Sequence, residues 1–141
     1  MRGSGRPLGL TPEQHVFVTE RHLATLTTLR PDGTPHVVPV AFTWDPEQSV
    51  IRVTAGGGSM KVRNVERALA AGAVPRAAVC QVDGGRWLTF EGAVEVSREP
   101  AEVAEAERRY ARRYREPRPS TTRVVLRVTP DRVMGSAYMT R

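Results

Sequence analysis

Short alternating runs joined by tight turns are the feature that most constrains the fold of this chain. Residues 22–30 alternate between two faces. One face carries Leu23, Thr25, Thr27 and Leu29, and the other carries Ala24, Leu26 and Thr28. The turn Pro31-Asp32-Gly33-Thr34 then leads into a second extended run, residues 35–45. These two runs predict a β-hairpin, and therefore an antiparallel sheet.

The rest of the chain continues this pattern. We expect further strands over residues 50–55, 77–82, 87–96 and 122–129, with 133–138 extending the last one beyond Pro130. We expect helices over 11–20, 60–71 and 100–115; the first begins with a capping box formed by Thr11 and Gln14. Six to seven strands with two or three peripheral helices predict a mainly β (α+β) fold, a small antiparallel barrel. Because such a barrel is filled by its own side chains, a ligand must bind at its rim or between two barrels of a dimer.

Composition fits one small domain. At 141 residues we expect a disordered arm over 1–10 and a single domain over 11–141. The lone Cys80, the lack of a long apolar run and the lack of a signal-peptide core predict a cytoplasmic protein with no membrane span. The net charge of +6 suits an acidic partner. Nucleic acid is disfavoured, because the basic residues are not interleaved with aromatic ones and no zinc-finger or RNA-binding signature occurs.

A glycine-rich stretch between an expected strand and an expected helix is the strongest functional signal. Residues 54–64 read T-A-G-G-G-S-M-K-V-R-N. Gly58 allows close approach of the backbone, Ser59 is a good N-cap, and the helix N-terminus adds unpaired N–H donors. Lys61 and Arg63 add positive charge, with Asn64 one turn from Lys61. These features together predict an anion site, most naturally for a phosphate; the alternative is an ordinary flexible loop before a surface helix.

Lys61 is distinctive, since it is the only lysine among 21 basic residues. A compact ammonium differs from a guanidinium in shape and hydration, so a tight phosphate pocket can prefer lysine. On the expected helix, Val62, Val65 and Leu69 form the apolar stripe, and Lys61 and Asn64 lie off it.

The second strand of the hairpin carries Pro39, which cannot donate a hydrogen bond to a sheet. We therefore expect an edge strand or a bulge there. Either would leave room for a flat ligand against the backbone; a plain edge proline is the alternative interpretation.

No metal or acid–base motif is apparent. His15, His22 and His36 are scattered, without the spacing of metal ligands, so no metal site is predicted. We interpret His36 as a structural histidine with satisfied hydrogen bonds. An enzyme with an anion site but no obvious acid, base or nucleophile would rely on a bound cofactor.

Four segments resemble the pyridoxamine-phosphate-oxidase-like split β-barrel family of flavin and deazaflavin proteins. They are L-A-T-L-T-T-L-R-P-D-G-T-P-H-V-V-P-V at 23–40, G-S-M-K-V-R-N at 58–64, C-Q-V-D-G-G-R-W-L-T-F-E-G at 80–92 and R-Y-A-R-R-Y-R-E-P-R-P at 109–119. The last two are most similar to the branch that uses coenzyme F420, and within it to the biliverdin-reductase-like proteins.

The resemblance implies a homodimer with the cofactor between the barrels. It places Lys61 at the cofactor phosphate, with Gly58, Ser59, Arg63 and Asn64 nearby. The backbone of Val38, Pro39, Val40 and Ala41 would lie against the cofactor ring, and Trp87 of the partner subunit would line the site.

The resemblance also implies a function. Reduced coenzyme F420 would pass a hydride to a conjugated acceptor, for example biliverdin to give bilirubin. FMN-dependent relatives have an arginine where this chain has Met60, which favours the deazaflavin. The alternatives are an FMN-binding oxidoreductase of the same fold, or a non-catalytic module that binds a flavin or a tetrapyrrole.

Overall fold

A computed structural model describes residues 8–140 of the chain. Residues 1–7 of the expected N-terminal arm lie outside the described residues, while Leu8 and Leu10 pack against the hydrophobic core. The elements in chain order are α1 (Pro12–Thr19), β1 (Ala24–Leu29), β2 (Pro35–Val40), β3 (Phe42–Asp45), β4 (Val50–Gly56), α2 (Met60–Ala70), β5 (Arg76–Asp83), β6 (Arg86–Ser97), α3 (Pro100–Arg113), β7 (Arg123–Gly135) and α4 (Ala137–Thr140).

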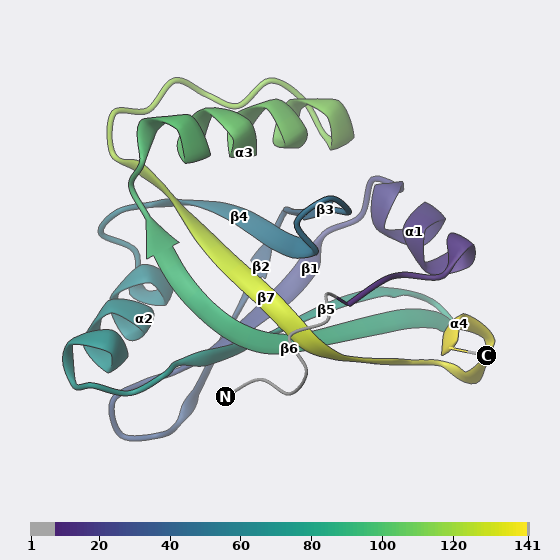
Figure 1. Cartoon of the computed structure of the whole chain (residues 1–141), viewed down its shortest axis with the longest axis horizontal. Coiled ribbons are helices and arrows are strands. Elements are labelled where there is room, and N and C mark those ends of the chain that lie inside the picture. The colour runs from purple at the N-terminus through teal and green to yellow at the C-terminus, as the bar shows by residue number, and fades with distance from the viewer. Residues whose placement is uncertain (1–7, 141) are drawn as a thin grey trace.

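Seven antiparallel strands form one curled sheet in the order β2-β1-β5-β6-β7-β4-β3 (Figure 1). The two edge strands, β2 and β3, follow each other in the chain and meet at Ala41. The expected single strand over 35–45 is therefore two strands, because residues 35–40 pair with β1 whereas residues 42–45 pair with β4. Pro39 lies on the edge strand β2, one of the two placements predicted for it, and edge strands tolerate proline because they pair on one side only.

The long strands β6 and β7 cross the whole sheet. The two runs expected at 122–129 and 133–138 form one strand, β7, which continues through Pro130 to Gly135 and is followed by the one-turn helix α4. Pro130 is accommodated because it lies opposite Gly92, where the register shifts. A Cβ atom on Gly92 would lie 2.0 Å from the Thr129 carbonyl oxygen, so this position requires glycine.

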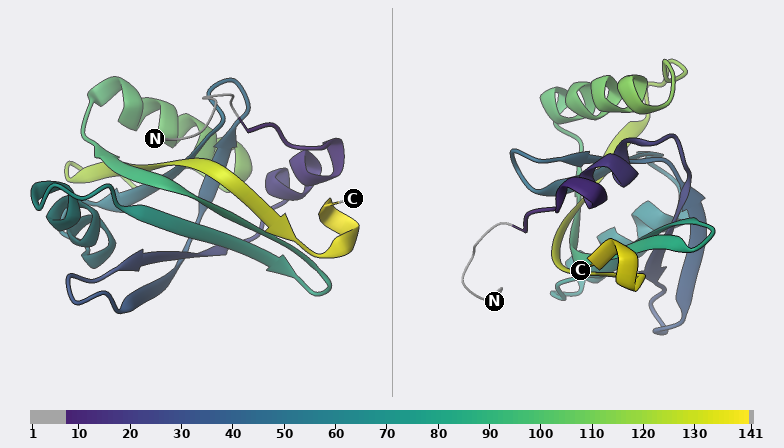
Figure 2. Two further views of the ribbon diagram at one scale, coloured as in Figure 1. Left: turned by 60° about the horizontal axis from the view of Figure 1, so that its bottom comes forward. Right: turned by 90° about the vertical axis from the view of Figure 1, so that its right-hand side faces the viewer.

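The concave face of the sheet holds the core. The face of β1 that carries Ala24, Leu26 and Thr28 points inward, as its alternation predicted. The larger core side chains are Leu26, Phe42, Ile51, Leu88, Phe90 and Leu126, and α2 adds Val62 and Val65. The right-hand view of Figure 2 shows the sheet curling round this interior, with α3 lying across one side of it.

Specific polar contacts fasten the helices to the sheet. The predicted capping box of Thr11 and Gln14 is present, and Gln14 Nε2 also donates to the Met139 carbonyl of α4, 2.9 Å away. At the end of α3, Arg113 donates to the carbonyls of Glu20 and Phe42 and to Gln81 Oε1. Arginine-rich α3 is thus attached to the end of α1 and to the strands β3 and β5.

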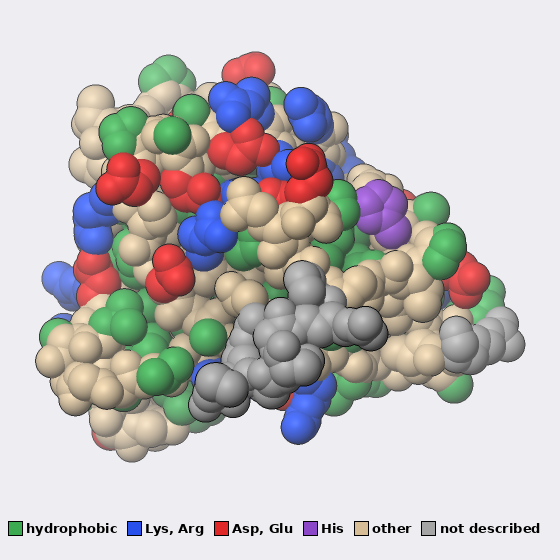
Figure 3. All heavy atoms as spheres, in the orientation of Figure 1, with side chains coloured by type: hydrophobic (Ala, Val, Ile, Leu, Met, Phe, Trp, Pro, Cys, Tyr) green, Lys and Arg blue, Asp and Glu red, His purple; other side chains and the backbone are tan. Residues whose placement is uncertain are grey.

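A buried ion-pair network explains part of the arginine content. Arg52 is fully buried; its Nη1 lies 2.8 Å from Asp45 Oδ2 and its Nε 2.5 Å from Glu102 Oε2, which also pairs with Arg127. Burial alone would raise the pKa of Asp45, but hydrogen bonds from Arg52 and two backbone N–H groups lower it on balance. Acidic and basic side chains are likewise intermixed around α3 in Figure 3. Much of the basic charge on this face therefore serves structure.

The architecture is the predicted mainly β (α+β) split barrel. Three helices were expected, and the fourth, α4, replaces the end of the expected last strand. Within residues 8–140, no helix has the length and apolar character needed to span a bilayer.

Candidate functional site

The candidate site begins where β4 ends and α2 begins. Ser59 occupies the N-cap position of α2, but its hydroxyl does not cap the helix. Instead Ser59 Oγ donates to the Gly56 carbonyl, 2.9 Å away, because the glycine turn brings that carbonyl within reach. The expected side-chain cap is therefore wrong. Within residues 8–140, no side chain caps the first turn of α2, and N–H groups left free in this way attract anions.

The glycine loop is held close to another loop. The Gly57 N–H donates to the Thr122 carbonyl at 2.9 Å, and a Cβ atom on Gly57 would lie 3.1 Å from that oxygen. Gly56 and Gly58 have open space around their α-carbons. Gly58 thus lies on an accessible backbone segment directly before the helix.

Lys61 is half-buried in the first turn of α2. Among residues 8–140 it has neither an ion-pair nor a hydrogen-bond partner, and burial lowers the pKa of its ammonium group. A partly desolvated cation without a counter-ion is destabilised until an anion approaches it. Arg63, two residues further on, is exposed.

The environments of Asn64 and Leu69 are the reverse of the prediction, which placed Leu69 on the buried stripe of the helix and Asn64 off it. Asn64 is 3% exposed and donates from Nδ2 to Thr28 Oγ1 at 3.0 Å, whereas Leu69 is 44% exposed. The reason is tertiary packing: α2 rests on the inward face of β1, which turns Asn64 rather than Leu69 toward the sheet. Together with the two buried valines of α2, Asn64 therefore holds the helix, and hence Lys61, against the sheet.

The β2 residues expected at the cofactor ring flank the same strand β1. Val38 pairs with Leu26, Pro39 with Thr25 and Val40 with Ala24. Val40 is buried and Pro39 is exposed, while Ala41 lies at the junction with β3. Since β2 is an edge strand, its outer edge carries no hydrogen-bonded neighbouring strand and is open to a ligand.

Trp87 is not brought to this place within one chain. It begins β6 near α4, where its carbonyl accepts from the Ser136 N–H, and α4 lies at the opposite end of the molecule from α2 in Figure 1. The structure thus places α2 against β1 through Asn64, and leaves Trp87 near α4.

The environment of His36 differs from the prediction that it is a structural histidine with satisfied hydrogen bonds. It lies opposite Thr28 in the β1–β2 register, so the two side chains share one face of the sheet. Its Nδ1 atom is buried and has no hydrogen-bond partner among the described residues, as is also true of Asn64 Oδ1. The expectation of a fully satisfied histidine is wrong, and only the register, which places His36 beside the Thr28–Asn64 pair, could have revealed this.

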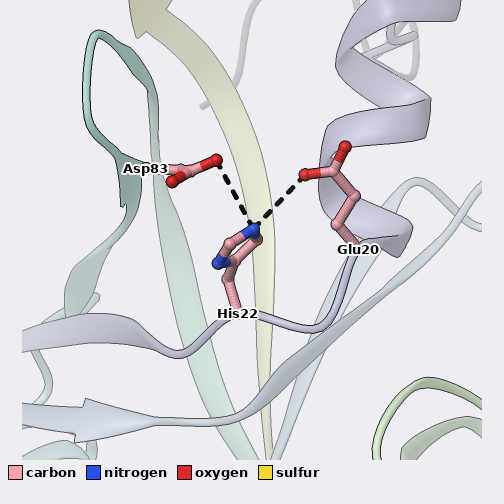
Figure 4. Close-up of side chains that lie close together, drawn as sticks. All are labelled: Glu20, His22 and Asp83. Atoms are coloured by element: carbon pink, nitrogen blue, oxygen red, sulfur yellow. Dashed lines mark ion pairs between the residues drawn. The ribbon is translucent and has the colours of Figure 1, made fainter.

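A second polar cluster lies elsewhere. Within residues 8–140, Glu20, His22 and Asp83 form the one group whose potential metal-ligand atoms all lie within 4.8 Å of one another (Figure 4). Arg86 already pairs with Glu20 and Asp83, and its hydrogen bonds lower the pKa of both carboxyls. The cluster is thus an ion-pair group in which Arg86 already engages both carboxylates, rather than an open ligand set.

The chain is similar to known proteins. Residues 10–136 match the family model described as pyridoxamine 5'-phosphate oxidase. The chain is 48% identical over 128 residues to the F420H(2)-dependent biliverdin reductase of Mycobacterium tuberculosis (strain CDC 1551 / Oshkosh), covering 91% of this chain and 89% of that protein.

Solved structures show the same fold. A conserved hypothetical protein of Mycobacterium tuberculosis, Rv2991, superposes with a TM-score of 0.75 at 22% identity, over 96% of this chain and 89% of that one. A structure described as an F420 reductase superposes with a TM-score of 0.65 at 28% identity, over 92% and 98% of the two chains. The chain therefore belongs to the pyridoxamine 5'-phosphate oxidase family.

Proposed function

We propose that this protein is a coenzyme F420-dependent reductase that transfers a hydride from the reduced deazaflavin to a conjugated small-molecule acceptor, with biliverdin as the first candidate. The observation that carries the proposal is Lys61, a half-buried ammonium without a counter-ion at the uncapped start of α2. The 48% identical relative named as an F420H(2)-dependent biliverdin reductase supports both the cofactor and the acceptor.

The residues present fit an acidic cofactor. Lys61 would hold the phosphate by a charge-assisted hydrogen bond, and Gly58, Ser59 and the first N–H groups of α2 would add neutral donors. Exposed Arg63 would contribute longer-range attraction, and Asn64 would fix the helix that carries Lys61. Met60 leaves this pocket with one cation rather than two, which suits the deazaflavin better than FMN.

The redox chemistry would come from the cofactor. The bound deazaflavin supplies the hydride, and this chain supplies position and electrostatics. The open edge of β2 at Val38, Pro39, Val40 and Ala41 would provide a flat backbone surface against which a ring can be oriented. Lys61, anchored through α2, would fix how far that ring extends along β2.

We also propose that the protein is a homodimer in which Trp87 of the partner subunit completes the site. The outward face of β1, β2, β5 and β6 carries exposed apolar side chains, including Val37 (55% exposed) and Val82 (59%). They lie on paired strands, so they form one surface. Val82 pairs with Trp87, so burying this face would carry Trp87 into the interface. The single domain over residues 11–141 and the cytoplasmic location stay predictions.

Two measurements test the function. In the first, the purified protein is titrated with F420 and with FMN while the cofactor absorbance or fluorescence is followed. Saturable F420 binding supports the proposal, and tight FMN binding without F420 binding would reject it in favour of an FMN oxidoreductase.

In the second measurement, reduced F420 bound to the protein is mixed with biliverdin by stopped flow. Oxidation of the deazaflavin together with bilirubin formation is expected, and binding without turnover would identify a non-catalytic module.

A further inference from the structure

A separate cavity lies on the side of α2 that faces the loop leading into β5. Its volume is about 470 Å³, which is within the range of small-molecule sites. Its walls are mainly apolar and include Leu29, Pro31, Val65, Ala68, Ala71 and Val74. Neither Lys61 nor any β2 residue lines it, so it is distinct from the proposed cofactor site.

The charged side chains that line this cavity are all basic. Three arginines line it, Arg30, Arg67 and Arg76, and no aspartate or glutamate does so. Arg76 is neutralised by Asp131 at 2.7 and 2.8 Å. Arg30 donates to the Pro35 carbonyl at 2.6 Å and interacts electrostatically with Asp32, whereas Arg67 forms no ion pair within residues 8–140. An anion bound here would therefore meet two cations, of which Arg67 has no counter-ion among the described residues and Arg30 has only Asp32, which lies outside the lining.

Asn64 provides a second, independent indication that the cavity is a binding site. It is 3% exposed, lines the cavity, and leaves Oδ1 without a hydrogen-bond partner while Nδ2 bonds to Thr28. Because the Thr28 hydroxyl can donate as well as accept, the amide can also take the flipped orientation, with Oδ1 on Thr28 and Nδ2 free. One buried amide atom of Asn64 is thus left without a partner at the wall of the cavity, and it is an acceptor or a donor according to the orientation of the amide.

We propose that this cavity binds an amphipathic carboxylate: a body of one or two rings packed against Val65, Ala68 and Ala71, with the carboxylate directed toward Arg67 and Arg30. Apolar walls favour burial of the rings, and the guanidinium groups of Arg67 and Arg30 select a negatively charged head group over a neutral one. This site does not depend on the identity of the cofactor, because no residue of the Lys61 pocket other than Asn64 belongs to it.

The test uses 2-naphthoate as the probe and the neutral 2-naphthamide as its isostere, with isothermal titration calorimetry on the full chain. The expected result is 1:1 binding of naphthoate with a dissociation constant of roughly 10 µM to 1 mM, given its size, and weaker binding of the amide. Ala68→Leu fills the cavity and should weaken naphthoate binding by at least about tenfold. Arg67→Gln should remove most of the preference for the acid over the amide.

Two matched controls separate this site from non-specific binding. Ala70→Leu makes the same change on the same helix at a position that does not line the cavity, and Arg112→Gln removes an exposed charge from α3. Both should leave naphthoate binding unchanged.

Binding that Ala68→Leu does not weaken would overturn the proposal. The absence of binding at millimolar probe would also overturn it, and this is the result expected if a second copy of the chain covers the cavity. F420 titration of Ala68→Leu is a separate readout, so failure here and failure of the proposed function are distinguishable.

Discussion

At the scale of single residues, the proposed cofactor site depends on Lys61, whose charge has no counter-ion among the described residues. Its position in the first turn of α2 could be predicted from sequence, because a glycine loop, a serine and a basic residue precede an amphipathic run. Its half-buried state could not, because that depends on how α2 packs. The burial of Asn64 was missed for the same reason, since its partner Thr28 lies 36 positions away in the sequence.

Replacing Lys61 by alanine tests its role directly. Loss of one charge-assisted hydrogen bond should weaken F420 binding by about 1.5–3 kcal/mol. The melting temperature should not fall, because the wild-type ammonium is partly desolvated and unpaired. Fluorescence titration and thermal unfolding measure the two effects. Arg21→Ala, which removes an exposed positive charge elsewhere, is the control and should change neither; unfolding of Lys61→Ala would show that the residue has a structural role.

The pH dependence of F420 affinity gives a second prediction. Burial lowers the pKa of Lys61 in the free protein, and a bound phosphate should raise it again. Affinity should therefore be fully present below the free-protein pKa and decline as pH rises through that lowered value, with proton uptake on binding. Lys61→Arg should lose this decline, since arginine stays protonated. An identical decline in both proteins would assign the titration to the ligand instead.

At the scale of elements, the positions of the strands could be predicted from alternating residues and turn residues. The points at which a strand breaks or continues could not. Both faces of β1 could be predicted because its inward and outward positions alternate strictly. The division of residues 35–45 between β2 and β3 could not, because it arises from pairing with two different partners, β1 and β4. Likewise, Pro130 marked the end of a strand by local rules, yet Gly92 opposite it allows β7 to continue.

Gly92→Ala tests this explanation of the β6–β7 pairing. The new Cβ atom would collide with the Thr129 carbonyl at 2.0 Å and with the Pro130 backbone, which has little room to move. We expect a loss of at least about 2 kcal/mol in the free energy of unfolding, measured by denaturant titration. The control Gly85→Ala places its Cβ in open space and should cost less than about 1 kcal/mol. Equal stability of the two variants would contradict the assigned register.

At the scale of the whole molecule, the apolar outer face of the sheet and the distant position of Trp87 have one common explanation. A second chain packed on that face would cover the exposed side chains and carry its own Trp87 toward the site. Alternation and turn residues were enough to predict the split barrel, which the structure confirms, whereas the anion site at Lys61 stays a prediction. The spatial separation of Lys61 from Trp87 becomes visible only once the strand order β2-β1-β5-β6 is known.

Val37→Lys should weaken the proposed dimer. A charge at this exposed position on β2 would have to be desolvated in the interface, so sedimentation velocity should show a shift toward monomer and F420 affinity should fall with it. Val16→Lys on α1 makes the same change at a side chain that is 57% exposed but lies off this face, and it should leave the dimer intact. A wild-type protein that is monomeric at tens of micromolar would refute the interface.

The most direct test is a crystal structure of the protein with F420 bound. It should show the phosphate of the cofactor about 2.7–3.0 Å from the Nζ atom of Lys61, with the ring along the open edge of β2. A structure in which the cofactor binds elsewhere, or in which Lys61 faces solvent without a contact to it, would contradict the central claim.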